Sequence, residues 1–312
     1  MISIENLTKY YGNVRAVNRI NFQVKEGEIL GFLGPNGAGK STTLKMLTCF
    51  LTPTEGTIKI DNYNIYDNPT EIREMIGYLP ENNPLYTDMI VYDYLKFIAS
   101  LRGLSEEQFR KNFKSVIAKC GLIGVVSKPI RTLSKGYRQR VGLAQAIIHD
   151  PKILILDEPT AGLDPNQIIE IRELIKELGR EKTLILSSHI LQEVQAVCNR
   201  IVIINKGDIV ADGMMEELQA SFQGTTRLHI ELIASDFDSE AIKSEMPELN
   251  IVSLNYNDGV LNLTLEYSVA RDMRAEIFEY IKNKGWTILE MHREFISLED
   301  LFRTLTQNKG VA

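Results

Sequence analysis

Nine consecutive residues near the start of the chain have the types and the spacing to bind a phosphate chain. They are Gly34, Pro35, Asn36, Gly37, Ala38, Gly39, Lys40, Ser41 and Thr42, a glycine followed by four residues and then by Gly-Lys-Ser/Thr. Glycines let successive backbone N–H groups point inward around an anion. The ammonium of Lys40 would reach the β- and γ-phosphates of a nucleotide, and the hydroxyl of Ser41 would bind Mg²⁺.

The segments on either side of this loop predict how it is held. Residues 28–33 have the pattern of a buried strand, and residues 42–47 that of a helix. Such a strand ends at the edge of the sheet where open α/β folds bind ligands, and the helix N-terminus turns its positive dipole end toward the phosphates. A glycine-rich turn that binds nothing is the alternative. The flanking strand and helix favour an ATP site.

A second apolar strand, residues 153–156, ends in two acids, Asp157 and Glu158. Asp157 would hold the Mg²⁺ ion, the usual role of an acid in this second motif. Glu158 follows directly and points differently, so it can orient and polarise an attacking water. Taken alone, the two acids could be a solvated strand end. With the phosphate-binding loop upstream, they indicate ATP hydrolysis.

The whole chain sets limits on these predictions. It has 312 residues, of which 44% are apolar, and this length favours two domains with packed cores. No apolar run approaches the ~18 residues that span a bilayer. Residues 1–5 lack the basic and apolar regions of a signal peptide. We therefore expect a cytoplasmic protein that reaches a membrane only through a partner.

The net charge and the positions of the cysteines and histidines argue against further classes of partner and of site. The net charge of −6 argues against a nucleic-acid partner. The three cysteines, Cys49, Cys120 and Cys198, are far apart and form no C-x-x-C pair, and the four histidines show no metal-ligand spacing. We expect small buried thiols rather than disulfides, and no transition-metal site.

Four further segments, with the loop and the acid pair, resemble ABC (ATP-binding cassette) ATPases. Residues 133–140 resemble the family's signature motif, residues 161–164 its D-loop, residues 187–189 its switch histidine (His189), and residues 10–12 its adenine-stacking loop. The resemblance covers residues 1 to about 220. It implies an α/β fold, a P-loop NTPase cassette with a mixed-sheet core and a helical subdomain at about residues 86–148. It also implies that Tyr11 stacks on the adenine.

The family resemblance implies how such a site works. In ABC ATPases the signature of one subunit covers the ATP held by another, so one chain needs an identical partner or a second ABC cassette. Lys40 and His189 of one chain would contact the γ-phosphate together with Ser134 and Gly136 of the other. Hydrolysis, with Glu158 as the base, would loosen the dimer and drive a membrane permease.

Two positions depart from the family pattern. Glu81 stands where the family usually has a glutamine that binds Mg²⁺ and senses the transporter. Glu81 keeps a ligating oxygen and adds a negative charge near the acid pair. The signature's usual Gly-Gly-Gln is Lys135-Gly136-Tyr137 here, although Ser134 and Gly136 remain. We expect Lys135 to be solvated rather than bound to phosphate.

Two more segments narrow the resemblance. Residues 78–86 and 291–302 are similar to the ATP-binding subunit of the gliding-motility ABC transporter of Bacteroidetes and, more broadly, to the drug- and polymer-exporting branch. This implies an exporter subunit that is peripheral on the cytoplasmic face of the inner membrane.

Residues 221–312 have the pattern of a separate domain. Alternation predicts strands at 227–232, 249–256, 260–267 and 286–291, and helical spacing predicts helices at 236–246 and 269–281. This β-α-β-β-α-β order, with a hairpin turn at 257–259, is that of an α+β ferredoxin-like domain. A terminal amphipathic helix would follow, with a capping box at 297–300 and with Leu298, Leu301, Phe302 and Leu305 on one face. A structural or dimer-contacting appendage and a small-molecule sensor both remain open.

The leading hypothesis is the Mg²⁺-dependent ATPase subunit of an ABC exporter. The alternative is a soluble ABC ATPase that acts on ribosomes or DNA. Ribosome-acting members usually fuse two cassettes, and DNA-repair members insert long coiled coils between the two ATP motifs. This chain carries one set of motifs and no sustained heptads between them. A binding-only cassette is disfavoured because Glu158 and His189 are both present.

Overall fold

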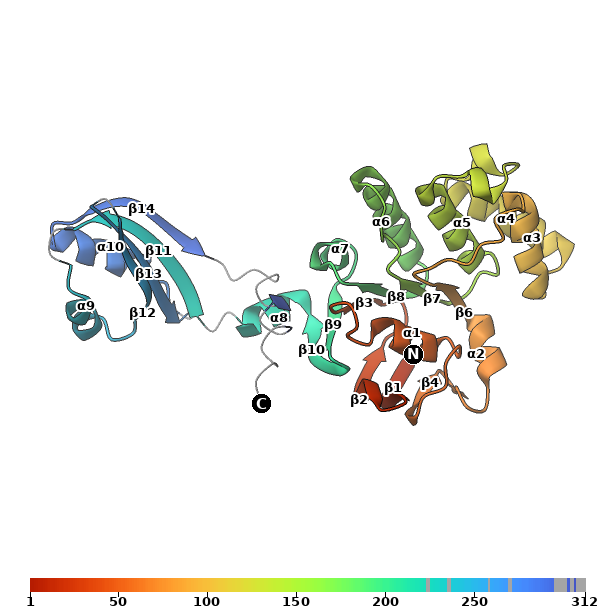
Figure 1. The fold of residues 1–312 in the computed structure, drawn as a ribbon, viewed down its shortest axis with the longest axis horizontal. Helices are drawn as coiled ribbons and strands as arrows, with labels where there is room; N and C mark the ends of the chain where they lie inside the picture. The colour runs from red at the N-terminus through yellow and green to blue at the C-terminus, as the bar shows by residue number, and fades with distance from the viewer. Residues whose placement is uncertain are drawn as a thin grey trace. The chain divides into compact units, whose positions relative to one another are not determined.

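The computed structural model describes residues 1–222, 225–234, 237–257, 259–268, 271–294, 302–303 and 306 of the chain. These residues divide into two compact units, Met1–Met215 and Glu216–Ala312 (Figure 1). The division lies at the first residue of helix α8 (Met215–Phe222), slightly before the boundary near residue 220 that the sequence suggests.

A six-stranded sheet forms the centre of the first unit, in the order β10-β9-β3-β8-β7-β6. Its strands are β3 (Ile29–Leu33), β6 (Ile76–Leu79), β7 (Ile153–Asp157), β8 (Thr183–Ser188), β9 (Arg200–Asn205) and β10 (Asp208–Met214). Neighbouring strands pair in parallel except β9 and β10, which are antiparallel. Strands β7 and β8 are buried at every position, as expected where both faces of a parallel sheet are covered. Because β3, β7 and β8 run in the same direction, their carboxyl ends meet at one edge.

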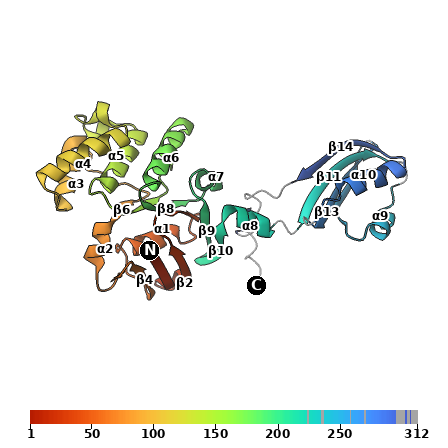
Figure 2. The ribbon, with the colours of Figure 1, turned by 180° about the vertical axis from the view of Figure 1, so that it is seen from behind.

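A second, antiparallel sheet has the order β2-β1-β4-β5. Its strands are β1 (Ile2–Tyr11), β2 (Val14–Val24), β4 (Glu55–Ile60) and β5 (Tyr63–Asn64). Helix α1 (Lys40–Leu47) lies between this sheet and the first one (Figures 1 and 2). Leu44 and Leu47 of α1 belong to one buried cluster with Ile4 of β1, Phe32 of β3 and Val202 of β9. The two sheets therefore share one core, and α1 is held rigidly at its N-terminal end.

The remaining helices of the first unit are α2 (Pro69–Met75), α3 (Val91–Leu101), α4 (Glu106–Lys119), α5 (Lys135–Ile147), α6 (Pro165–Gly179) and α7 (Leu191–Gln195), with short 3₁₀ turns at Ile123–Val125 and Ile130–Thr132. Ser105 and Gln108 form a capping box that starts α4. The rings of Tyr92, Phe109 and Phe113 join α3 to α4, with centroids 5.1 to 5.7 Å apart. Helices α3 to α5 fall within the range 86–148, where the sequence suggests a helical subdomain.

The burial of two of the three cysteines agrees with the sequence-based expectation. All three thiols are free; Cys120 and Cys198 are buried, and Cys49 is half-buried. Burial raises the pKa of the Cys120 thiol to about 12, so this side chain behaves as a small apolar residue. Within the described ranges no group of three or more His, Cys, Asp or Glu side chains is arranged to hold a metal ion.

The second unit contains one antiparallel sheet in the order β12-β13-β11-β14. Its elements along the chain are β11 (Thr225–Ile233), α9 (Ser239–Glu245), β12 (Asn250–Asn257), β13 (Val260–Ser268), α10 (Arg274–Asn283) and β14 (Thr287–Glu294). This element order and strand order are those of a ferredoxin-like arrangement. Trp286 is partly buried against the core and packs beside Phe237 and Tyr280. Asp258 of the predicted hairpin turn, Val269 of the predicted helix, and the predicted terminal capping box with Leu298, Leu301 and Leu305 lie outside the described residues.

His149, just after α5, makes the first unit sensitive to pH. Its Nε2–H donates to the carbonyl of Ile76 at 3.2 Å. Burial, with the positive charge of Arg102 nearby, lowers the His149 pKa from 6.5 to about 4. The unfolded chain therefore takes up a proton at a higher pH than the folded one, so this contribution to stability is complete above about pH 6.5 and is lost progressively toward pH 4.

We expect the free energy of unfolding of the first unit to fall by about 1 to 2 kcal/mol between pH 7 and pH 5 because of this residue. His149→Gln can keep the hydrogen bond to Ile76 without a titrating group, and it should flatten the profile. The measurement is urea unfolding at several pH values. His292→Gln, at an exposed histidine of the second unit, is the control and should leave the profile unchanged. A profile equally steep in His149→Gln would contradict this assignment.

Candidate active site

The loop Gly34–Gly39 connects β3 to α1 and has the backbone geometry of an anion cradle. Gly37 and Gly39 have φ values of +78° and +111°, a region that L side chains rarely adopt. A Cβ at Gly34 would lie 2.3 Å from the carbonyl oxygen of Ile204, so only glycine fits there. The loop therefore leads directly into the N-terminus of α1, as the sequence predicts, and it fits a phosphate group.

Lys40 is the first residue of α1, and its side chain folds back over this loop. Its Nζ donates to the carbonyl oxygens of Gly34 at 2.7 Å and Pro35 at 3.3 Å. It also lies 3.3 Å from Oε1 of Glu158, and both side chains of this ion pair are buried. A buried cation beside a glycine-rich loop at a helix N-terminus is an arrangement that suits a chain of phosphates.

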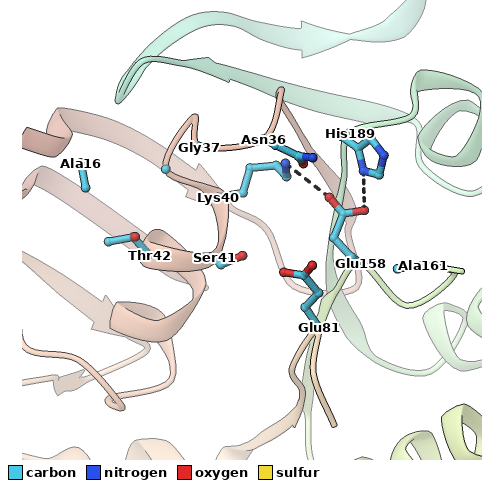
Figure 3. A pocket seen from close by; sticks show the side chains of 11 residues that line it. Ala16, Asn36, Gly37, Lys40, Ser41, Thr42, Glu81, Glu158, Ala161 and His189 are labelled. Carbon is cyan, nitrogen blue, oxygen red and sulfur yellow. Dashed lines mark hydrogen bonds and ion pairs between the residues drawn. The ribbon is translucent and has the colours of Figure 1, made fainter.

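Glu158 occupies the centre of the site (Figure 3). It follows the end of β7 with a φ of +48°, a conformation uncommon for a residue other than glycine. Its backbone N–H donates to the Ser187 hydroxyl at 3.0 Å, and this bond holds the turn. Oε2 lies 2.9 Å from Nδ1 of His189. Within the described residues Oε1 faces Lys40 but has no hydrogen-bond partner, and the side chain is buried.

Strand β8 supplies a residue whose role the sequence does not reveal. The hydroxyl of Ser187 donates to Asp157 Oδ1 at 2.6 Å, and strand pairing sets these two residues opposite each other. Asp157 is almost completely buried. Ser187 thus binds the Asp157 carboxylate and the backbone of Glu158 together. A hydroxyl residue near the end of the strand that precedes His189 is the only sequence signal for this role.

A second hydroxyl of the same strand positions the segment that carries His189. Ser188 donates to Glu193 Oε2 at 2.7 Å and accepts the N–H of Ile190 at 3.0 Å. Glu193 is buried in the short helix α7. These bonds flank His189 on both sides in the chain, so its ring is directed by the strand end and by the helix after it.

The cavity at this edge has a volume of about 360 Å³. It is lined by Ala16, Asn36, Gly37, Gly39, Lys40, Ser41, Thr42, Glu81, Glu158, Ala161 and His189. Ala16 of β2 was not foreseen; its carbonyl oxygen lies 2.6 Å from where a Cβ at Gly39 would be. The structure thus brings together residues of five separate segments of the chain, whose proximity the motifs alone indicate only by analogy with the family.

Tyr11, Ser134 and Gly136 are candidate residues on other elements, and they do not line this cavity. Tyr11, at the end of β1, is 49% exposed, and Lys9 Nζ lies 5.7 Å from its ring. Ser134 caps α5 by accepting the N–H of Tyr137 at 3.4 Å, and Gly136 is buried in the first turn of that helix. Ser134 and Gly136 do not line the cavity of their own chain. Lys135 is exposed in the single chain.

Ser41, Glu81 and Asp157 line a second cavity of about 440 Å³. Hydroxyl and carboxylate oxygens suit Mg²⁺, which keeps several waters and binds proteins through one or two carboxylates. The hydroxyl of Tyr78, also in this cavity, is buried and has no partner among the residues described. Burial and the charges of Asp157 and Glu81 raise the Tyr78 pKa above its usual value of 10. The donor set fits a Mg²⁺ ion held between Ser41 and the two acids.

The comparisons with known proteins agree with this geometry. The sequence profile of the ABC transporter family matches residues 17–161. The chain is 35% identical over 303 residues to the ABC transporter ATP-binding protein YxlF of Bacillus subtilis (strain 168), an alignment that covers 97% of this chain and 98% of YxlF. The chain belongs to the ABC transporter ATP-binding proteins. The expected cassette fold is thereby confirmed, and ATP is the nucleotide that such a cassette binds.

Two further relatives of this ABC protein add detail. This chain is 33% identical over 315 residues to the bacitracin transport ATP-binding protein BcrA of Enterococcus faecalis. The alignment covers 100% of this chain and 98% of BcrA. A dimeric structure of the ATP-binding cassette MJ0796, in a post-hydrolysis state bound to ADP and Pi, has a TM-score of 0.63 at 28% identity. The structural alignment covers 69% of this chain and 99% of the MJ0796 chain. ABC ATP-binding subunits dimerise and work with membrane permeases. Among the residues described here, no helix is long and apolar enough to cross a membrane.

Proposed function

We propose that this ABC protein hydrolyses ATP with Mg²⁺ as the subunit that powers a membrane exporter. The observation that carries the proposal is the buried Glu158, which lies between Lys40 and His189 at the mouth of the phosphate-binding loop. A carboxylate that lines the cavity in a left-handed turn, with one oxygen beside His189 and the other facing Lys40, is positioned to accept a proton from water.

The residues of the site divide the reaction among them. The loop amides and Lys40 would bind the β- and γ-phosphates, and Ser41, Asp157 and Glu81 would hold Mg²⁺, which neutralises phosphate charge when bound. Glu158 would orient the attacking water and accept its proton. His189 would contact the γ-phosphate and keep Glu158 in place through their 2.9 Å contact. Tyr11, exposed at the end of β1, would stack on the adenine.

We infer that a second copy of the chain completes each site. Ser134 and Gly136 start α5 but do not line the cavity of their own chain, which supports their use by a partner. In this arrangement two chains bind two ATP molecules head to tail. The dimeric MJ0796 structure supports the dimer as a form that related cassettes adopt.

Turnover at different protein concentrations tests this function. We expect ATP hydrolysis per chain to rise with protein concentration, because a monomer lacks a signature opposite its own Lys40. The assay is phosphate release over a wide concentration range, with light scattering to record the association state. A constant rate per chain in a protein that stays monomeric would contradict the head-to-tail site.

The permease would dock beside the metal ligands. The 440 Å³ cavity extends from Ser41 and Asp157 to Pro84 and to Phe50, whose side chain is 76% exposed. Exposed aromatic side chains at the rim of a cavity are typical of contact sites. Glu81 borders both cavities, so a change in metal occupancy could be transmitted from one to the other.

We expect Glu81→Gln to weaken the binding of Mg²⁺ in the presence of ATP. One negative charge near the metal is worth on the order of 1 kcal/mol at the edge of a protein, so half-maximal activity should require about fivefold more Mg²⁺. Nucleotide binding without metal should be almost unchanged. The measurement is activity against Mg²⁺ concentration at fixed ATP, with Glu71→Gln on α2 as the control. Superimposable curves would exclude a special role for Glu81.

Export, gliding motility, the domain roles and the cellular location are supported by fewer observations than ATP hydrolysis is. Export is supported by the full-length similarity to BcrA, a bacitracin transport protein. A role in gliding motility rests on the resemblance of residues 78–86 and 291–302 alone, and deletion of the gene followed by a surface-motility assay tests it. We further propose that residues 1–220 act as the ATPase domain, that residues 221–312 act as an accessory domain, and that the protein is peripheral on the cytoplasmic face of the inner membrane.

A further inference from the structure

The second unit has a sheet edge that plays no part in ATP hydrolysis. Strand β12 is an edge strand: within the described residues it pairs with β13 alone. Its eight residues, Asn250–Asn257, include neither a charged residue nor a proline. Proteins usually protect exposed edges with charges, prolines or short strands, because the unpaired backbone groups can bind another strand. The opposite edge, β14, is protected in this way by Glu290, Arg293 and Glu294.

The side chains of β12 alternate so that one face is apolar. Leu254 and Tyr256 pair with Leu263 and Leu261 of β13, which are buried in the core beneath the helices. Leu254 and Tyr256 are nonetheless 40% and 51% exposed. Because β12 is an edge strand, a further strand paired with it would cover part of this exposed surface.

We propose that β12 pairs in antiparallel fashion with β12 of a second copy of this chain, so that two four-stranded sheets join edge to edge. In an antiparallel pair, opposed residues lie on the same face of the sheet, which restricts the register. The register that places Asn255 on the two-fold axis sets Leu254 of each copy opposite Tyr256 of the other. Both apolar pairs then lie on the helix-bearing face, and the amides of the two Asn255 side chains meet on the other.

A second copy fits this edge better than an unrelated strand does. A two-fold axis at Asn255 sets this residue opposite its own counterpart and its neighbours opposite one another, so any charge near the axis would lie close to a like charge. The absence of charge along all eight residues meets this requirement. Since ABC cassettes dimerise, two copies would also be held near each other, which raises the effective concentration of the two edges. The pairing goes beyond the proposed ATPase function and does not depend on bound nucleotide.

Cross-linking in the full-length protein tests the register. Opposed residues of an antiparallel pair have Cα atoms about 4.5 to 5.5 Å apart, within the reach of a disulfide. In a Cys49→Ser background, Asn255→Cys should therefore form a covalent dimer under mild oxidation without ATP. Leu289→Cys, an exposed position on β14, is the matched control and should remain monomeric on a non-reducing gel. Equal cross-linking at both positions, or none at Asn255→Cys, would overturn the proposal.

A charged residue placed at the two-fold axis allows a second, independent test, in which self-association is measured. Asn255→Asp keeps the shape of the side chain and sets two carboxylates opposite each other, so self-association without nucleotide should weaken about threefold to fivefold. Leu254→Lys, which removes both apolar pairs, should weaken it more. Sedimentation equilibrium measures the association, and circular dichroism verifies that the variants are folded. Lys40→Met should associate like the wild type, which separates this contact from the ATP-dependent dimer. Unchanged association in both edge variants would refute the pairing.

Discussion

Glu158→Gln should retain ATP binding and lose hydrolysis by about 10²- to 10⁴-fold, the usual cost of removing a general base. The amide has the shape of the carboxylate but cannot accept the proton of water. It can still contact His189, so the site should keep its form. Because ATP is bound and not consumed, dimers should accumulate with ATP and elute early in size-exclusion chromatography.

Two further variants test whether the loss of hydrolysis is specific to the carboxylate of Glu158. Glu158→Asp keeps the charge but withdraws it by one methylene from Lys40 and His189, so its activity should lie between wild type and Glu158→Gln. Glu170→Gln, at an exposed residue of α6 that pairs with Arg140, should hydrolyse ATP normally. Near-wild-type turnover in Glu158→Gln would refute the role of Glu158 as the base, and another group would have to accept the proton.

Lys40→Met should lower ATP affinity by about 10²- to 10⁴-fold. Hydrogen bonds to charged groups contribute roughly 1.5 to 3 kcal/mol each, and Lys40 would lose two of them, one to each of the β- and γ-phosphates. Methionine fills a similar volume, so the buried position remains packed. Lys45→Met, in the last turn of the same helix, is the matched control and should bind ATP normally. Titration calorimetry measures both affinities, and equal values would exclude Lys40 as a phosphate ligand.

The Lys40–Glu158 ion pair adds a stability effect that binding data alone do not reveal. Both side chains are buried, and removal of one partner from a buried pair leaves an uncompensated charge. Lys40→Met should therefore lower the free energy of unfolding. The double variant Lys40→Met/Glu158→Gln should recover much of the loss, because no buried charge then remains unpaired. This restoration distinguishes a local charge effect from general damage to the fold.

The position of Ser187 shows how far the site could be predicted from sequence. The phosphate-binding loop and the acid pair are each continuous in the chain, so residue types and spacing predicted both. The hydrogen bond from Ser187 to Asp157, by contrast, depends on β7 and β8 being neighbours in a parallel register. Two strands separated by helix α6 can pair in several orders and registers, and their apolar sequences do not choose among these.

Glu81 and Tyr78 also show which features of the site could be predicted from the sequence and which could not. The family pattern indicated a metal-binding role for Glu81, and the structure places its side chain in both cavities. The burial of the Tyr78 hydroxyl near Asp157 and Glu81 had no sequence signal, since a tyrosine near the end of a strand is as often exposed. Its surroundings arise because β6 lies beside β7. In the second unit, alternation predicted the strands, but only the sheet order identified β12 as an edge.

The sequence by itself determined the chemistry available to this protein: a glycine loop for phosphate, a lysine and two acids for hydrolysis, and a signature segment that belongs to the ABC family. These features are local, because the backbone freedom of glycine and the order of neighbouring side chains act over a few residues. The tertiary structure decided which groups meet. It set Glu158 between Lys40 and His189, joined Asp157 to Ser187, and left β12 at a sheet edge. Those contacts arise from strand order and packing, which depend on the burial of the whole core rather than on any single segment.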